Sequence, residues 1–154
     1  MKELLEYRKQ LIARLLTASV EFQDACLAVH DPHAVMVDGW NTHQIASHTR
    51  DVHKLVYGLR AARTAKEDNP KFQNFDGDAY MAEHYSASEP LEDILNGFVE
   101  DVKEAAGMLT ALPVDAWSRL SRHATFGNGF TLQTWVERDL AHIEEHLETV
   151  KKKV

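Results

Sequence analysis

Two histidines four residues apart, His142 and His146, have the spacing to hold one metal ion between them. They lie in a C-terminal segment whose apolar residues recur at helical spacing. Positions i and i+4 are neighbours on one face of an α-helix, so two imidazoles can reach the same ion. Two ligands make only a weak metal site. Without a third ligand, the pair is better interpreted as two partly exposed polar residues at the edge of a helix. A third ligand must come from elsewhere in the chain.

His48 is the best candidate for the third ligand. It lies near the middle of the apolar stripe of another predicted helix, a stripe made by Ile45, Val52, Leu55, Val56 and Leu59. His48 follows the start of that helix by about seven residues, whereas His142 and His146 precede the end of theirs by about nine and five. If the two helices run antiparallel, the three side chains meet at one level near one end of the fold. His43 and His53 fall off the stripe, and both are predicted to be solvated.

Four long amphipathic segments must position these histidines. Apolar spacing predicts helices over about 2–29, 41–66, 88–112 and 131–151. Asn41, Ser88 and Thr131 are residue types that cap helix starts, and Gln44 completes a capping-box variant with Asn41. No segment shows the alternation typical of a strand. The predicted fold class is therefore all-α, a four-helix bundle that forms a single domain over residues 1–154.

The connection over residues 67–88 decides how the helices are directed. It is polar and long for a compact domain, with a short helix predicted over 79–85. Short loops would make the second and fourth helices parallel. A connection of this length can cross the bundle, which gives the order up-down-down-up and makes those two helices antiparallel. The later connection over 121–130 is predicted to be a loop because of its glycines.

The net charge and the composition of the chain limit the classes of molecule that it can bind. The net charge of −7 argues against nucleic acid, and no apolar run approaches the length of a membrane span. The expected partner is a small-molecule substrate. The single cysteine, Cys26, excludes an internal disulfide and fits a reducing cytoplasm. Cys26 is expected to fill the core and not to act as a nucleophile.

Two motifs give the chain a resemblance to a known family. Residues 40–51 contain a tryptophan at a helix start, then His48, then an aspartate three positions later. Residues 123–146 contain His-x-x-Phe-Gly, which leads into a helix with His-x-x-x-His. In this order and spacing they resemble the two signatures of the DinB/YfiT-like superfamily, whose members are regarded as metalloenzymes, and the match covers essentially the whole chain. One departure is Glu145, where many members have a histidine that is not one of the usual three ligands.

The resemblance implies a divalent metal ion on His48, His142 and His146. Three neutral nitrogens with an open position are typical of a catalytic site, and the ligand type suits Zn²⁺, Ni²⁺ or Fe²⁺. Characterised relatives include transferases that use low-molecular-weight thiols, so a thiol-dependent S-transferase with the thiol as cosubstrate is the leading expectation. The alternatives are a hydrolase that uses a metal-bound water and a non-enzymatic bundle for stress-response binding or dimerisation. Family analogy alone suggests a homodimer.

Asp51 and Asp139 are candidate supports for the ligands. Each lies one helical turn from a proposed ligand, Asp51 from His48 and Asp139 from His142. A metal-bound histidine usually donates its other ring N–H to an acceptor. The alternative is that both carboxylates are solvated charges, and the sequence leaves the two interpretations open.

Overall fold

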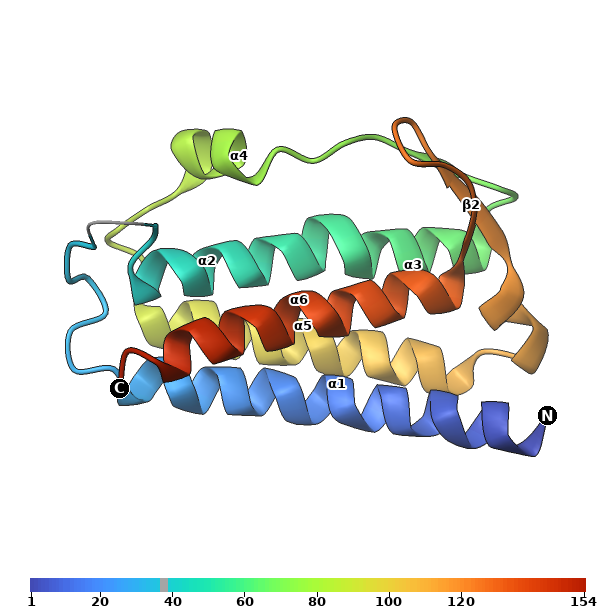
Figure 1. The fold of residues 1–154 in the computed structure, drawn as a ribbon, viewed down its shortest axis with the longest axis horizontal. Coiled ribbons are helices and arrows are strands. Elements are labelled where there is room, and N and C mark those ends of the chain that lie inside the picture. The colour runs from blue at the N-terminus through green and yellow to red at the C-terminus, as the bar shows by residue number, and fades with distance from the viewer. Residues whose placement is uncertain (37–38) are drawn as a thin grey trace.

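The structure is a computed structural model, and it describes residues 1–36 and 39–154. Most of the chain is helical, in long helices that lie side by side (Figure 1). The long elements are α1 (Lys2–Ala28), α2 (Thr42–Val52), the π-helical turn η1 (His53–Tyr57), α3 (Gly58–Lys66), α5 (Leu91–Ala111) and α6 (Leu132–Lys151). The short ones are β1 (Lys71–Phe72), α4 (Gly77–His84), the 3₁₀ turn η2 (Val114–Ser118), β2 (Leu120–His123) and β3 (Gly127–Thr131). The all-α four-helix bundle predicted from the sequence is confirmed.

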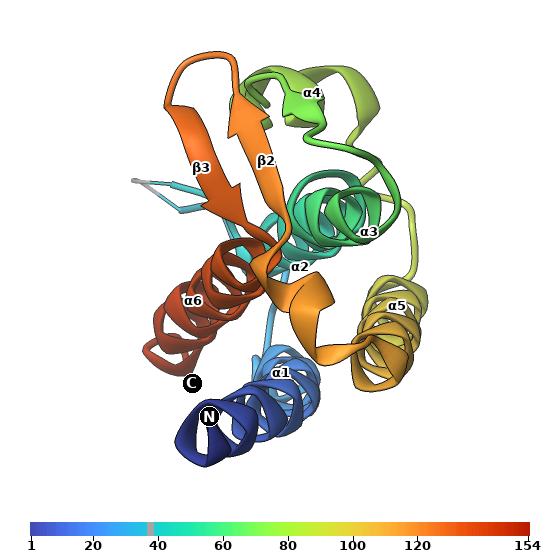
Figure 2. The same cartoon turned by 90° about the vertical axis from the view of Figure 1, so that its right-hand side faces the viewer.

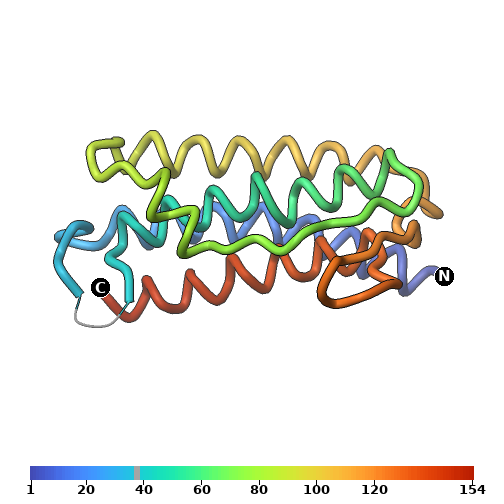
Figure 3. Tube along the Cα trace, turned by 90° about the horizontal axis from the view of Figure 1, so that it is seen from above, coloured from blue at the N-terminus to red at the C-terminus, as the bar shows by residue number. Residues whose placement is uncertain are grey.

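The four helical columns are α1, α2 with α3, α5, and α6, which an end-on view places at four corners (Figure 2). In Figure 1, α1 and α6 run toward the left, and α2–α3 and α5 run toward the right. The connection from α3 to α5 contains β1 and α4 and returns along the outside of α2–α3 (Figure 3). The start of α2 consequently lies beside the end of α6, at the left of Figure 1.

One hydrophobic core lies between the columns, and each column contributes to it. Its largest fully buried apolar side chains include Phe22 of α1, Ile94 and Phe98 of α5, and Trp135 of α6. Cys26 is also fully buried there, as expected. Among the described residues, none of the helices is long and apolar enough to cross a membrane.

Helix starts are capped largely as predicted. Asn41 and Gln44 form the reciprocal capping box at the start of α2, and the Thr131 hydroxyl accepts from the backbone N–H of Thr134. The predicted cap at Ser88 is wrong. α5 begins at Leu91 after Pro90, which has no side chain that could cap it.

The column formed by α2 and α3 contains an irregularity that the sequence pattern did not reveal. In η1, the Gly58 N–H bonds to the carbonyl of His53, five residues back, which inserts one extra residue into the turn. Every later residue is rotated relative to an uninterrupted 3.6-residue helix. Leu59, predicted in the core, is 42% exposed, while Arg60 and Ala61 are buried.

A small sheet covers the end of the bundle where α3 ends and α6 begins (Figure 2). The prediction of a loop over 121–130 is wrong, because β2 and β3 form an antiparallel hairpin there. β1, from the long connection, adds parallel to β2 and pairs Phe72 with His123. The strands are short and mostly polar, and two glycines of β3 have positive φ angles, Gly127 at 94° and Gly129 at 86°.

Candidate metal centre

The three histidines predicted as ligands meet in space. The Nε2 atom of His142 lies 3.2 Å from Nε2 of His48 and 3.0 Å from Nε2 of His146. Each of the three residues offers a ring nitrogen within 4.8 Å of those of the other two. Two nitrogens bound to one tetrahedral zinc ion at 2.0–2.1 Å are about 3.3 Å apart. Two of the three donor pairs are therefore close to the spacing that a single ion requires, and the third lies within 4.8 Å.

The position of His48 is fixed from two sides. The ring of Trp40, just before the α2 cap, lies 4.6 Å from the His48 ring between centroids. On the other side is Gly77, the first residue of α4, where an added Cβ would lie 3.1 Å from His48 Cε1. The start of α4 thus approaches the histidine so closely that only glycine fits without displacement. The tryptophan of the first motif is therefore explained by its contact with a ligand candidate, and Gly77 is a second contact that the motifs did not indicate.

The surroundings keep these imidazoles neutral. Burial lowers the pKa of His142 to about 3, with the neighbouring His146 and His48 adding to the effect. Burial, followed by the nearby His146, lowers the pKa of His48 to about 4. The pKa of His146 is also lowered by burial, against an opposing effect of Glu145. Neutral histidines with free Nε2 lone pairs are the form that binds a metal ion.

Two buried polar atoms near the cluster have no hydrogen-bond partner among the described residues. One is Nδ1 of His142, and the other is Oδ1 of Asp139. The two residues are three positions apart on α6 and therefore share a face. A histidine that binds an ion through Nε2 has its proton on Nδ1 and needs an acceptor for it. The unpaired nitrogen and the unpaired carboxylate oxygen fit this requirement.

The other oxygen of Asp139 has a partner that the sequence did not indicate. Asp139 Oδ2 accepts a 2.7 Å hydrogen bond from Nδ1 of His53, and both side chains are almost fully buried. Burial by itself would lower the pKa of His53, but Asp139 and then Asp101 outweigh it and raise the pKa overall. The prediction that His53 is solvated is wrong, because the ring is directed inward at the start of the π-helical turn. Asp139 is not a solvated charge.

Asp51 has a different environment. Its carboxylate accepts a 3.0 Å hydrogen bond from Nε of Arg50, and the same guanidinium also pairs with Glu89. Among the described residues, Asp51 forms no hydrogen bond with His48. The structure therefore places Asp51 in an ion-pair network on α2, whereas Asp139 lies in the buried layer behind the histidines.

His43 is also buried, which contradicts its predicted exposure. Its Nε2 lies 2.7 Å from the Glu89 carbonyl, which can only accept, and its Nδ1 lies 2.6 Å from the Tyr85 hydroxyl. The proton is therefore on Nε2, and Nδ1 accepts from Tyr85. Through these two hydrogen bonds, His43 joins the end of the long connection to α2. It is not part of the candidate metal site.

A pocket of about 290 Å³ opens beside two of the three histidines. It lies between α2–α3 and the long connection, and its walls include residues from the hairpin. The lining residues are His48, Val52, Val56, Tyr57, Arg60, Asn74, Phe75, Gly77, His123, Phe126 and His142. A group bound here would have direct access to the histidine cluster. Sequence reasoning did not identify Arg60, whose burial depends on the π-helical turn before it.

His123, which belongs to the second motif, has a defined tautomer in this pocket wall. Its Nδ1 accepts hydrogen bonds from the backbone N–H groups of Thr125 and Phe126, at 3.1 and 3.2 Å. The ring proton of the neutral form is therefore on Nε2. Burial lowers the pKa of His123, and Arg60 and Arg138 lower it further. His123 is thus a neutral donor in the pocket wall.

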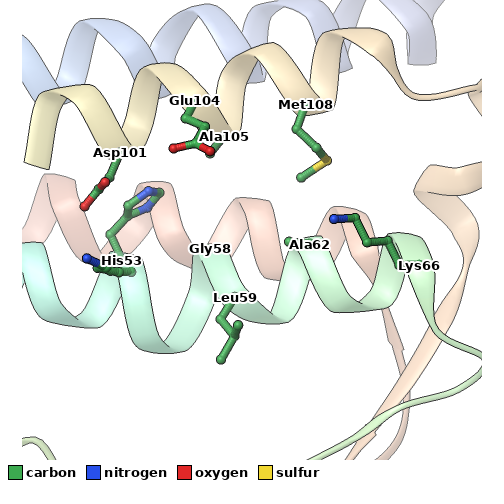
Figure 4. A pocket seen from close by; sticks show the side chains of 10 residues that line it. His53, Gly58, Leu59, Ala62, Lys66, Asp101, Glu104, Ala105 and Met108 are labelled. Carbon is green, nitrogen blue, oxygen red and sulfur yellow. The ribbon is translucent and has the colours of Figure 1, made fainter.

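Another pocket, of about 310 Å³, lies between α3 and α5 (Figure 4). Its lining includes His53 and Asp101, as Figure 4 shows, but none of the three clustered histidines. Its acidic side chains, Asp101 and Glu104, come from α5, and its lysines, Lys54 and Lys66, come from η1 and α3. The pocket beside the histidine cluster is therefore the better candidate for chemistry.

Comparison with known proteins agrees with this architecture. No protein-family model matches the chain, and no curated protein matches it by sequence. Among solved structures, a similar one is that of YfiT from Bacillus subtilis, described as a probable metal-dependent hydrolase with an unusual four-helix bundle topology. The TM-score is 0.86 at 18% sequence identity, over 96% of this chain and 86% of YfiT. The likeness in fold that the two motifs predicted is confirmed, and the chain is a four-helix bundle with the fold of YfiT.

Proposed function

We propose that this chain is a metal-dependent hydrolase in which His48, His142 and His146 hold a divalent ion. The observation that supports this most strongly is the convergence of three neutral histidines, each with a ring nitrogen within 4.8 Å of those of the other two, at the edge of a pocket. The description of YfiT as a probable metal-dependent hydrolase supports the same reaction class. The substrate is proposed to be a small molecule, because the pocket is only about 290 Å³.

In this proposal, each residue of the site has a separate role. A divalent ion in such a site supplies a Lewis acid and a water activated near neutral pH. His48, His142 and His146 hold the ion without adding negative charge, so its positive charge is not offset by its ligands. Asp139 would orient His142 by accepting from its Nδ1–H. The Nε2–H of His123 and the guanidinium of Arg60 are donors placed to stabilise negative charge on a substrate in the pocket.

A thiol-dependent S-transferase is the second candidate. Three neutral ligands leave a divalent ion with its full positive charge, which favours a thiolate as a further ligand. The protein does not provide that thiol, because Cys26 is fully buried in the core, where burial raises its pKa to about 12. A transferase would therefore need a low-molecular-weight thiol as cosubstrate, and that thiol would have to enter the same pocket.

Metal analysis tests the ligand set. The purified wild-type chain is expected to retain about one equivalent of a divalent ion, and His142→Ala is expected to retain none. His84→Ala is the matched control, because His84 is an exposed histidine on α4 outside the cluster. A His142→Ala protein that still holds one equivalent would exclude the proposed site.

Activity assays then separate the two reaction classes. The metal-loaded protein is incubated with a panel of nitrophenyl esters and, separately, with a small thiol and 1-chloro-2,4-dinitrobenzene. A hydrolase releases nitrophenol without thiol and loses this activity with a chelator. Metal-dependent thiol consumption with no ester hydrolysis would favour the transferase. Metal retention with neither activity on broad panels would favour the non-enzymatic alternative.

A further inference from the structure

Arg60 is a buried cation in the wall of the pocket beside the histidine cluster. Its side chain is directed inward on α3, and the residue is only 7% exposed. The guanidinium carbon lies 4.8 Å from the ring centroid of Trp135, and the rings of Phe72 and Tyr57 lie within 6 Å of it. These aromatic faces hold the guanidinium in place by cation–π contacts. They do not neutralise its charge.

Arg60 lacks the carboxylate partner that a buried arginine normally has. Among the described residues, no acidic oxygen lies within 4.0 Å of it, whereas Arg50 pairs with Asp51 and Arg63 pairs with Glu67. Within the part of the chain that the structure describes, its one hydrogen bond runs from Nη2 to the carbonyl of Gln73, at 2.9 Å. A guanidinium has five N–H donors, so most of its hydrogen-bonding capacity is unused by the protein.

The rest of the pocket wall has the same electrostatic character. None of the residues that line it is an aspartate or a glutamate. His123 adds the neutral Nε2–H donor described above, and its pKa is lowered partly by the positive charge of Arg60. Burial, opposed by Tyr57 and reinforced by Arg138, lowers the pKa of Arg60 as well. A site with a fixed cation, an N–H donor and no acidic group is suited to an anion.

We propose that the pocket binds an anionic group of the substrate, a carboxylate or a phosphate, on the guanidinium of Arg60. That the bound molecule is a substrate rests on the proposed function. The anion site itself does not, since it is built from residues that are not metal ligands. The planar fork of arginine matches both anions through two parallel hydrogen bonds. The volume of about 290 Å³ limits the ligand to a compact molecule. One end of it would be anchored on Arg60 and the other would reach His48 and His142.

Binding of matched small probes tests the anion site directly. The full chain is titrated calorimetrically with benzoate, phenylphosphonate and the neutral analogue benzamide. One charge-assisted bidentate contact is expected to favour the anions about tenfold over benzamide. Arg60→Gln is expected to abolish this preference, and Arg60→Lys to retain part of it. Arg63→Gln, one turn further along α3 and already paired with Glu67, is the control and should bind the probes like the wild type.

The titrations are made on the protein as purified and again after removal of metal with a chelator. A preference for anions that disappears with the metal but survives Arg60→Gln would place the anion on the metal and overturn the proposal. Equal binding of benzoate and benzamide by the wild type would overturn it too. The opposite failure, a chain that retains no metal but shows the Arg60-dependent preference, would remove the hydrolase proposal and leave the anion site standing.

Loss of folding in Arg60→Gln is addressed by a measurement on the wild type. The Arg60 Nε–H and His123 resonances are assigned by NMR, and benzoate is added. Both resonances are expected to shift with the same dissociation constant as the calorimetric titration. Shifts confined to residues outside this pocket would refute the assignment even if no variant can be purified.

Discussion

At the scale of single residues, Asp139 lies one helical turn from His142 of the cluster and accepts a hydrogen bond from the buried His53. Its two oxygens differ, because Oδ2 accepts from His53, whereas Oδ1, like Nδ1 of His142, has no hydrogen-bond partner among the described residues. Asp139→Asn is expected to weaken metal binding by about 10–100-fold, since it removes the charge that is proposed to orient His142. The affinity is measured by competition with a chromophoric chelator.

Asp51→Asn is the matched control for that change. Asp51 is an aspartate one turn from His48, as Asp139 is from His142, but its partner is Arg50. Its removal is expected to leave the metal affinity unchanged. If both variants weaken the affinity equally, the effect of Asp139 is an unspecific loss of negative charge near the site. If neither does, Asp139 does not support a ligand.

The residue scale also shows what the sequence could predict about the site. The three clustered histidines could be predicted because His-x-x-x-His is a local helical pattern and the start of α2 is marked by its capping box. The hydrogen bond between Asp139 and His53 could not be predicted, because the two residues are 86 positions apart and His53 lies off the apolar stripe of a regular helix. Arg60 was missed for a related reason. A buried, unpaired arginine is exceptional, and no periodicity points to it.

At the scale of elements, the π-helical turn η1 determines which residues of α3 face the core. In this turn, Gly58 lies close to the backbone of His53. A Cβ added at position 58 would lie only 2.5 Å from the carbonyl oxygen of His53. Gly58→Ala is therefore expected to lower the free energy of unfolding by about 1–3 kcal/mol, although alanine favours a regular helix. Urea unfolding followed by circular dichroism measures the change.

Gly97→Ala provides the comparison for this substitution. Gly97 lies within α5, where an added Cβ would meet nothing within 4 Å. Without a clash, the gain in helix propensity should raise the free energy of unfolding by about 0.5–1 kcal/mol. Opposite signs for the two variants are the expected result. A stabilising Gly58→Ala would mean that the π-helical turn is not held in the folded protein.

The missed hairpin illustrates a different limit at this scale. β2 and β3 contain Ser121, Arg122, Asn128 and two glycines, residues that give no hydrophobic alternation. β2 also pairs with β1, which comes from a segment some 50 residues earlier. A strand that is stabilised by a distant partner and exposed on one side cannot be recognised from its own composition. The long helices could be recognised, because each carries its apolar face in its own sequence.

At the scale of the whole molecule, the route of the chain brings the histidines together. The segment between α3 and α5 returns along the outside of the bundle (Figure 3), so α5 begins at the same end as α2. The same segment supplies Gly77 against His48 and Asn74 and Phe75 to the pocket wall. One connection therefore sets the helix directions and covers the site. The length of this connection was the sequence feature that predicted the helix directions, whereas its contacts with the site required the structure.

The histidine cluster should also control how the stability of the metal-free protein depends on pH. The unfolded chain takes up protons on histidine near pH 6.5, whereas the pKa values in the folded chain are about 4 for His48 and about 3 for His142. Between pH 6.5 and 4 the unfolded state binds more protons than the folded state. The free energy of unfolding therefore falls as the pH is lowered through this range. His53, whose pKa is raised, acts in the opposite direction, since its stabilisation is lost as the pH rises above 6.5.

His142→Gln isolates the contribution of the cluster from that of the carboxylates. Urea unfolding of the metal-free wild type at pH 7 and at pH 4.5 gives the total loss of stability. His142→Gln should lose about 1–2 kcal/mol less over the same interval, after allowance for partial solvent screening. His84→Gln, at an exposed position, should lose as much as the wild type. Equal losses in the wild type and His142→Gln would contradict the neutral, buried state of His142. Because the cluster is neutral, it can bind an ion without first releasing protons, and this conclusion would then be lost as well.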